Sequence, residues 1–298
     1  MIKQYLLRSL MFVPAHNERL LDSAIRSDAD VLLLDIEDSV QPVENKQIAR
    51  NNILRYIKEG KFKDRVLFPR VNDRESGELL KDVHQLTVEG VDGFMFSKCA
   101  KGEDIYFFGQ LLEIIEREKG FPVGTFKIIP LIETTGAVVN IQDICNACSD
   151  RVIAVAFGSE DFLNDLEVRH DRPEGQNIFT ARAQIAIGAK SCGVVPIDTI
   201  HSNVHDLEDL EKNLVLAKKL GFEGMLILNP KELPLCHQYF SPSNEDLDWA
   251  NEIVEIANES LKSGKGVAIK NNTFVGPPWV KLANKMLKKQ EMIDKKIK

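Results

Sequence analysis

Several charged residues of this 298-residue chain stand directly after short apolar runs, where they could act on an anionic substrate. Glu133 and Asp161 each lie just past such a run, and Arg70 follows Pro69 at the end of another. Mg²⁺ prefers carboxylate oxygens and leaves its other positions to water and substrate oxygens. We therefore interpret Glu133 and Asp161 as Mg²⁺ ligands; alternatively, these acids cap helices or form ion pairs. The forked guanidinium of Arg70 matches a substrate carboxylate, although Arg70 could also be a structural ion-pair partner.

Polar residues follow the other apolar runs as well. Segment 35–38 (Asp-Ile-Glu-Asp) carries three acids in four residues, so not all of them can point the same way, and one could cap the next helix. We expect Glu37 and Asp38 to act in catalysis beside Arg70, and Gly158, Glu160 and Arg70 to bind the substrate. The remaining polar residues after the runs are Ser97, Lys98, Thr134, Thr135, Asp198 and Asn229.

The apolar runs themselves are short and rich in β-branched residues, which predicts strands. They are apolar almost throughout, so both faces of each strand should be covered, as in a parallel sheet wrapped by helices. The predicted strands span 9–13, 31–34, 65–69, 93–96, 127–132, 152–157, 194–197 and 224–228.

Longer amphipathic segments separate these runs and predict helices. They span 18–26, 45–59, 77–88, 103–119, 137–148, 177–192, 207–220 and 231–239. This alternation predicts an α/β protein with a (β/α)8 TIM barrel, whose active site lies at the carboxyl ends of the strands. No Gly-x-Gly-x-x-Gly motif follows the first strand, which argues against an open dinucleotide-binding sheet.

The barrel accounts for the chain as far as about residue 240, so we divide it into a catalytic domain, 1–240, and a C-terminal extension, 241–298. The extension is predicted to form a helix–hairpin–helix element. Its helices span 245–262 and 279–297, and its hairpin strands, 267–269 and 273–275, are joined by a Lys-Asn-Asn turn at 270–272. We expect a lid or a subunit-contact element rather than an independent domain.

Composition limits the possible partners and compartment. Lys and Arg number 38 against 45 Asp and Glu, for a net charge of −7, which argues against a nucleic-acid binder with a broad basic face. Five scattered cysteines do not form a disulfide framework, so we expect a reduced, cytoplasmic protein. No apolar run approaches the roughly 20 residues of a membrane span.

Other constellations carry less chemistry. Cys145 and Cys148 have redox or zinc spacing but fall in a predicted helix with no second pair, so we interpret them as buried packing residues. His201 and His205 are four apart, but no Glu follows His201 as in a zinc protease motif. His16 follows the first strand and could contact an anionic group.

The segments at the strand ends resemble, in order, those of the citrate lyase beta-subunit-like family, within the HpcH/HpaI aldolase superfamily. The segments are LRSLMFVPA, VLLLDIEDSV, PRVN, PLIETTGAV, FGSEDF and VVPIDT. This family includes malyl-CoA and citramalyl-CoA lyases. The resemblance covers essentially the whole chain and implies a Mg²⁺-dependent (β/α)8 barrel that cleaves a carbon–carbon bond in an acyl-CoA thioester. Family members assemble as trimers or hexamers.

The resemblance also implies roles for individual residues. Glu133 matches the Glu of the family's ETxxG motif and Asp161 the Asp of its GxxD motif; both are metal ligands there. Arg70 matches the Arg that contacts the ketoacid part of the substrate. The acids at 35, 37 and 38 match a segment that supports the ligands or holds water.

Three positions depart from the family pattern. Segment 97–100 keeps the Lys of a Pro-Lys-Val-Glu motif but loses its Glu, and Asn229-Pro230 replaces His-Pro. Gly276 stands where many members carry a proton-transferring Asp. The enolate proton would then come from water or from another acid.

We therefore expect a lyase that splits a citramalyl-, malyl- or citryl-thioester, carried on CoA or on an acyl-carrier partner, into a ketoacid and an acetyl thioester. One alternative is a metal-dependent aldolase acting on a free hydroxy-ketoacid. Another is a non-catalytic metal- or ligand-binding subunit of a lyase complex, which the Gly276 and Asn229 departures would explain.

Overall fold

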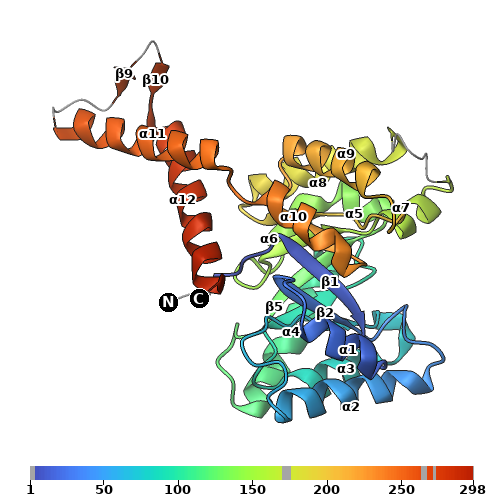
Figure 1. Ribbon diagram of the computed structural model, residues 1–298. Helices are drawn as coiled ribbons and strands as arrows, with labels where there is room; N and C mark the ends of the chain where they lie inside the picture. Colours follow the sequence, from blue (N-terminus) through green and yellow to red (C-terminus); the bar gives the residue numbers. More distant parts are fainter. Residues whose placement is uncertain (1–3, 170–175, 263–266, 271–272, 298) are drawn as a thin grey trace. The chain divides into compact units, whose positions relative to one another are not determined.

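The computed structural model describes residues 4–169, 176–262, 267–270 and 273–297 (Figure 1). The chain forms two compact units. One spans Leu7–Cys236, and the other combines the described parts of Met1–Leu6 and His237–Lys298. The break between them falls inside helix α10 (Leu233–Phe240), close to the expected domain boundary at residue 240. The assignment of 241–298 to a lid or subunit contact stays a prediction.

The first unit is a closed parallel barrel in which the order of the strands follows the sequence. Each strand pairs with the next one along the chain, and β1 closes the ring by pairing with β8 through Ser9 and Met225. The strands are β1 (Ser9–Pro14), β2 (Val31–Asp35), β3 (Arg70–Val71), β4 (Gly93–Phe96), β5 (Lys127–Ile132), β6 (Ala154–Phe157), β7 (Val195–Asp198) and β8 (Gly224–Ile227). The prediction of a (β/α)8 barrel is confirmed.

Helices surround the strands (Figure 1). They are α1 (Glu18–Ile25), α2 (Glu44–Lys58), α3 (Leu79–Leu86), α4 (Gly102–Lys119), α5 (Thr135–Val139), α6 (Ile141–Asn146), α7 (Ser159–Asp165), α8 (Gln176–Ser191), α9 (Leu207–Leu220) and α10, with short 3-10 turns at Arg74–Ser76 and Pro230–Glu232. Strands β2, β4 and β6 are buried along their whole length, as their uninterrupted apolar sequences predict. Most helix ends agree with the predicted ones to within one or two residues.

The third strand differs from its prediction. The expected strand was 65–69, but the ladder forms only at Arg70–Val71, with an isolated bridge between Leu67 and Leu32. Proline has no amide hydrogen to donate, so Pro69 interrupts the ladder. Its carbonyl still accepts a bond from the amide of Met95 on β4.

The expected helix at 137–148 is two short helices, α5 and α6, which meet at Asn140. The side-chain amide of Gln184 donates to the carbonyl of Val138, and that of Asn140 donates to the carbonyl of Ala100. Such tertiary bonds compete with a continuous helical ladder and mark the kink. Helix α7, which directly follows β6, was not predicted, and it carries Glu160 and Asp161.

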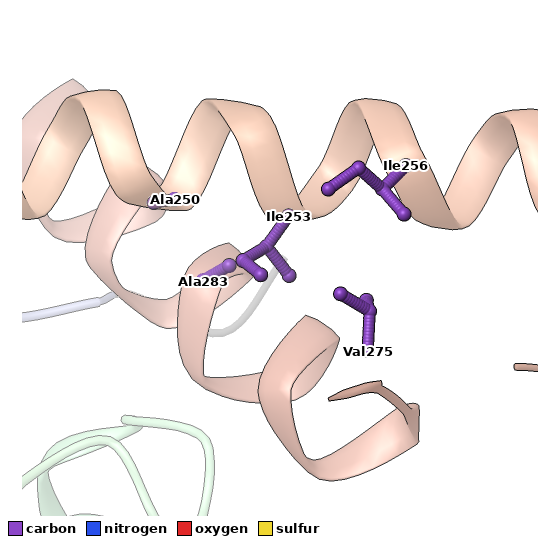
Figure 2. Packing of buried hydrophobic residues seen from close by; sticks show 5 residues of the cluster. All are labelled: Ala250, Ile253, Ile256, Val275 and Ala283. Atoms are coloured by element: carbon purple, nitrogen blue, oxygen red, sulfur yellow. The ribbon is translucent and has the colours of Figure 1, made fainter. Parts of the chain in front are cut away.

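The second unit contains the predicted elements: α11 (Asn244–Lys262), the antiparallel strands β9 (Ala268–Lys270) and β10 (Thr273–Val275), and α12 (Pro277–Ile297). The turn predicted at 270–272 lies partly outside the described residues, because 271 and 272 are not described. Figure 2 shows α11 packing on α12 and β10 through a small apolar core. Ala250 and Ala283 are fully buried there, and their small side chains let the two helices approach closely.

Among the described residues, no helix is both long enough and apolar enough to cross a membrane.

Candidate active site

The predicted site residues follow strands that all end on the same side of the barrel. Asp35 ends β2, Arg70 begins the short β3, Glu133 follows β5 and Gly158 follows β6. In a closed parallel barrel the carboxyl ends of all strands share one rim, so residues distant in sequence become neighbours. Ion pairs join Arg70 to the acids after β2, and Lys98 links one of these acids, Glu37, to Glu133.

Arg70 and Asp35 form a two-pronged ion pair within this cluster. The Nε and Nη2 atoms of Arg70 donate to Asp35 Oδ1 and Oδ2, each at 2.7 Å. Burial would raise the pKa of Asp35, but the Arg70 guanidinium and the Ser39 hydroxyl hold it below its usual value. The guanidinium also lies over the ring of Phe12, 4.7 Å from its centroid. One edge of the Arg70 fork is therefore bound to Asp35, whereas Nη1 lies beside the carboxylates of Glu37 and Asp38, at 3.3 Å and 3.5 Å.

Glu37 is a buried acid between two cations. Its carboxylate oxygens lie 3.3 Å from Arg70 Nη1 and 3.2 Å from Lys98 Nζ. Neither oxygen accepts a hydrogen bond of good geometry from the described residues. Burial raises the pKa of Glu37 to about 7 despite Arg70, and the neighbouring Asp38 adds to the rise. Asp38 itself is exposed, with its Oδ2 3.5 Å from Arg70 Nη1.

Glu133 is the more deeply buried of the two predicted metal ligands. Its Oε1 accepts the backbone N–H of Lys98. Burial raises the pKa of Glu133 to about 8, and the charges of Glu37 and Asp161 contribute to the rise. Asp161 is exposed, and its pKa is raised by partial burial and by Asp38. Burial and the neighbouring carboxylates therefore both favour the protonated form of these two acids when no cation is bound.

Gly158 makes room for Glu133. A Cβ atom at position 158 would lie 2.8 Å from Glu133 Cβ and 3.2 Å from its Oε2. Real Cβ atoms do not approach other carbons so closely, so a larger residue here would displace the Glu133 side chain. Gly158 thus leaves space for the Glu133 carboxylate. The expected contact between Gly158 and the substrate stays a prediction.

The residues present fit a hard divalent cation better than a soft one. Within the described parts of the chain, no three or more His, Cys, Asp or Glu side chains are already grouped as a metal site. The candidates are the carboxylates of Glu133 and Asp161, and the charge of Glu37, which is ion-paired with Arg70 and Lys98, acts on Glu133. An oxygen-only set with few protein ligands suits Mg²⁺, which keeps water and substrate oxygens in its remaining positions.

A buried polar network supports the segment that carries Glu37. Lys46 Nζ lies 3.4 Å from the carbonyl oxygen of Ile36 and 3.3 Å from that of Glu37, and it also donates to Asn72 Oδ1. Asn72 donates from its side chain to the carbonyl of Ile36 and to Asp82. Our sequence analysis did not identify Lys46, and Asn72 was only part of the PRVN segment. A buried lysine on a helix has no signal in the sequence pattern.

The other residues that the sequence singled out have surroundings of their own. Glu160 is exposed on α7, and Asn229 caps the 3-10 turn after β8 by accepting the amide of Lys231. Cys145 and Cys148 lie on or beside α6 as free cysteines. His16 Nδ1 is buried and has no hydrogen-bond partner among the described residues. Gly276 belongs to the second unit.

Comparison with known proteins places this site in a family. Residues 8–230 match the family described as HpcH/HpaI aldolase/citrate lyase. The chain is 30% identical to the citrate lyase subunit beta of Haemophilus influenzae, over 95% of this chain and 96% of that protein. It is 27% identical to an L-malyl-CoA/beta-methylmalyl-CoA lyase of Cereibacter sphaeroides, over 96% and 95% of the two chains. The chain therefore belongs to the HpcH/HpaI aldolase/citrate lyase family, and the expectation of a lyase-type enzyme is confirmed.

Solved structures share the fold. The chain resembles the CitE protein of Mycobacterium tuberculosis, solved with magnesium, acetoacetate and coenzyme A, with a TM-score of 0.70 and 24% identity over 95% of this chain and 99% of that one. A citrate lyase of Burkholderia xenovorans has a TM-score of 0.83 and 16% identity over 98% and 94% of the two chains. Sequence identity at this level supports the barrel fold alone, so the substrate must be argued from the residues of the site.

Proposed function

We propose that this protein is a Mg²⁺-dependent lyase that cleaves a carbon–carbon bond of a 3-hydroxy-3-carboxyacyl thioester, which yields a ketoacid and an acetyl thioester. The observation that carries the proposal is the cluster of Glu37, Glu133 and Asp161 around Arg70 at the carboxyl rim of the barrel. It combines carboxylate oxygens for a cation with a guanidinium group for the negative charge of a substrate. Family membership supports the same class of reaction.

Glu133 and Asp161 would hold the ion, and Gly158 leaves the space that Glu133 needs. When bound, Mg²⁺ would act as a Lewis acid that lowers the pKa of the substrate hydroxyl and supports negative charge on its oxygen. Arg70 contributes a fixed positive charge, held in place by Asp35, whose Nη1 is directed at the same region. This preorganisation requires no rearrangement as charge develops on the substrate.

The reaction includes two proton transfers, one from the substrate hydroxyl and one to the enolate carbon. We assign the acceptance of the substrate hydroxyl proton to the ionised form of Glu37, because this carboxylate is buried at the rim beside Arg70 Nη1 and Lys98 Nζ. Loss of that proton makes the hydroxyl carbon a ketone, the adjacent carbon–carbon bond breaks, and its electron pair passes to the enolate of the leaving thioester. The enolate carbon then takes a proton, from water or from an acid other than position 276, which is glycine.

The thioester class follows from the relatives, among them an L-malyl-CoA/beta-methylmalyl-CoA lyase and a structure solved with coenzyme A. We propose citramalyl-, malyl- or citryl-thioesters as substrates, presented on CoA or on an acyl-carrier partner. The test is to mix the purified protein with each CoA thioester and saturating Mg²⁺ and to follow ketoacid release. Cleavage of one of them, abolished by EDTA and by Glu133→Gln, supports the proposal. Failure to cleave any of them, on CoA or on a carrier protein, overturns it.

The same assay separates the two alternatives. Ketoacid released from a free hydroxy-ketoacid, with none from the thioesters, identifies an aldolase. Mg²⁺-dependent ligand binding without turnover identifies a non-catalytic subunit.

We also propose a cytoplasmic homo-oligomer, a trimer or hexamer, in which the extension 241–298 serves as lid or subunit contact. Exposed apolar side chains on the extension, including Leu261 and Ile269, support a contact role. Light scattering on the purified protein tests the assembly: a monomer at micromolar concentration would contradict it.

A further inference from the structure

Lys98 adopts a backbone conformation that its residue type disfavours. It follows β4 by two positions and has φ of +54°, in the left-handed region. A side chain with a Cβ pays a steric cost there, which glycine avoids. Residues held in such conformations persist where the surrounding structure imposes them, and they concentrate at functional sites.

The residues on both sides of Lys98 hold this turn in place. Ser97 and Cys99 are buried. The hydroxyl of Ser97 donates to the carbonyl of Val71 on β3, at 3.2 Å, and the thiol of Cys99 donates to the carbonyl of Leu131 on β5, at 3.5 Å. The turn is thus pinned to both neighbouring strands of β4, and Lys98 has little freedom to relax into an extended conformation.

The left-handed turn brings two parts of Lys98 into the acid cluster. Its backbone N–H donates to Glu133 Oε1, although 35 residues separate the two positions. Its ammonium lies 3.2 Å from Glu37 Oε1 and 3.1 Å from Asp73 Oδ2. One residue therefore contacts acids that follow three different strands, β2, β3 and β5.

The bond to Glu133 sets the direction of that carboxylate. Oε1 is bound by the N–H of Lys98, whereas Oε2 faces Gly158 and accepts no hydrogen bond from the described residues. The carboxylate therefore presents one oxygen that protein groups leave open. Without the N–H, the buried side chain could rotate, and the open oxygen would no longer have a fixed position.

We propose that Lys98 is a positioning residue, whose left-handed backbone aims its N–H at Glu133 so that the opposite carboxylate oxygen is held ready for a divalent cation. This inference rests on the proposed metal role of Glu133. The backbone N–H of Lys98 orients Glu133, and the ammonium group adds ion pairs with Glu37 and Asp73.

Two matched substitutions separate the backbone from the charge. Lys98→Asn and Lys98→Val both remove the ammonium, but asparagine tolerates the left-handed region and a β-branched valine does not. Mg²⁺ affinity of the full-length protein is measured by isothermal titration calorimetry, with thermal melting as the check on folding. We expect Lys98→Val to bind Mg²⁺ at least about fivefold more weakly than Lys98→Asn, from the cost of a left-handed conformation.

Equal Mg²⁺ affinities of the two folded variants would overturn the inference. If Lys98→Val does not fold, the milder pair Lys98→Gly and Lys98→Ala takes its place, and glycine should then bind Mg²⁺ more tightly than alanine. A wild-type protein that binds no Mg²⁺ would instead refute the proposed metal site, so the two failures are distinguishable.

Discussion

The Arg70 guanidinium on β3 donates hydrogen bonds to both carboxylate oxygens of Asp35 on the neighbouring strand β2, through Nε and Nη2 at 2.7 Å each. Both side chains are nearly buried, at 11% and 1% exposure. This pair fixes the plane of the guanidinium and leaves Nη1 directed toward Glu37. The charge that we assign to substrate binding is therefore built into the barrel before any substrate arrives.

Arg70→Met should lower both stability and activity. Asp35 would remain buried without its cation, which costs about 3–5 kcal/mol of unfolding free energy. We expect kcat/KM to fall by about a hundredfold or more, as for loss of a preorganised charge. Urea denaturation and ketoacid release measure the two effects. Arg117→Met is the control, because its ion pair with Glu113 is exposed and should contribute less than about 1 kcal/mol. Similar stability losses in both variants would contradict the structural role of the Arg70–Asp35 pair.

The stability of the metal-free protein should depend on pH through Glu37 and Glu133. Burial raises their pKa values to about 7 and about 8, from 4.5. The folded chain then keeps protons that the unfolded chain has already lost. From pH 4.5 up to the folded-state pKa of each group, about 7 for Glu37 and about 8 for Glu133, the free energy of unfolding falls as pH rises. The fall is up to about 1.4 kcal/mol per pH unit for each group. Urea denaturation from pH 5 to 8.5 in EDTA measures this slope.

Two further measurements test the origin of this pH dependence of the free energy of unfolding. Glu133→Gln should reduce the slope to the part that Glu37 contributes, because an amide does not titrate. Saturating Mg²⁺ should restore stability most at high pH, since the cation favours the ionised carboxylates. An unchanged slope in Glu133→Gln would show that the pH dependence arises elsewhere.

Gly158→Ala should displace Glu133. The new Cβ would lie 2.8 Å from Glu133 Cβ, so the carboxylate must move. We expect Mg²⁺ affinity to fall by about tenfold or more, as when support of a metal ligand is lost. Gly136→Ala on α5 is the matched control, because the nearest atom to its Cβ would lie at 3.6 Å, an ordinary contact. Equal Mg²⁺ affinities of the two variants, measured by calorimetry, would rule out the proposed spacing role.

Asn72→Ala should disturb the segment that carries Glu37. It removes the bonds to Ile36 O and Asp82 and leaves buried polar groups without a partner, at a cost of about 1–3 kcal/mol. We expect kcat to fall more than KM rises, because the substitution acts on the position of a catalytic group. Steady-state kinetics with urea denaturation provide both values. Gln47→Ala, on the exposed face of the same region, should change neither value appreciably.

The barrel could be predicted from the sequence because its signals are local. Apolar runs such as β4 and β5 begin and end where their composition changes, and their order specifies the order of strands in the barrel. The prediction was wrong where a long-range bond overrides local preference. The expected helix at 137–148 breaks at Asn140, where the carbonyl of Val138 accepts a bond from the side chain of Gln184, and such a partner is invisible in the local pattern.

The sequence by itself determined that acids and an arginine follow successive strands, since residues after parallel strands must meet at one rim. Only the tertiary structure decided how they pair: Arg70 on Asp35, Lys98 on Glu133, and Gly158 beneath that same carboxylate. Each of these contacts joins positions at least 25 residues apart. Which oxygen faces which donor depends on side-chain rotamers and on the close approach of neighbouring strands. Periodicity and spacing report the strand on which a residue lies, whereas packing selects its partner.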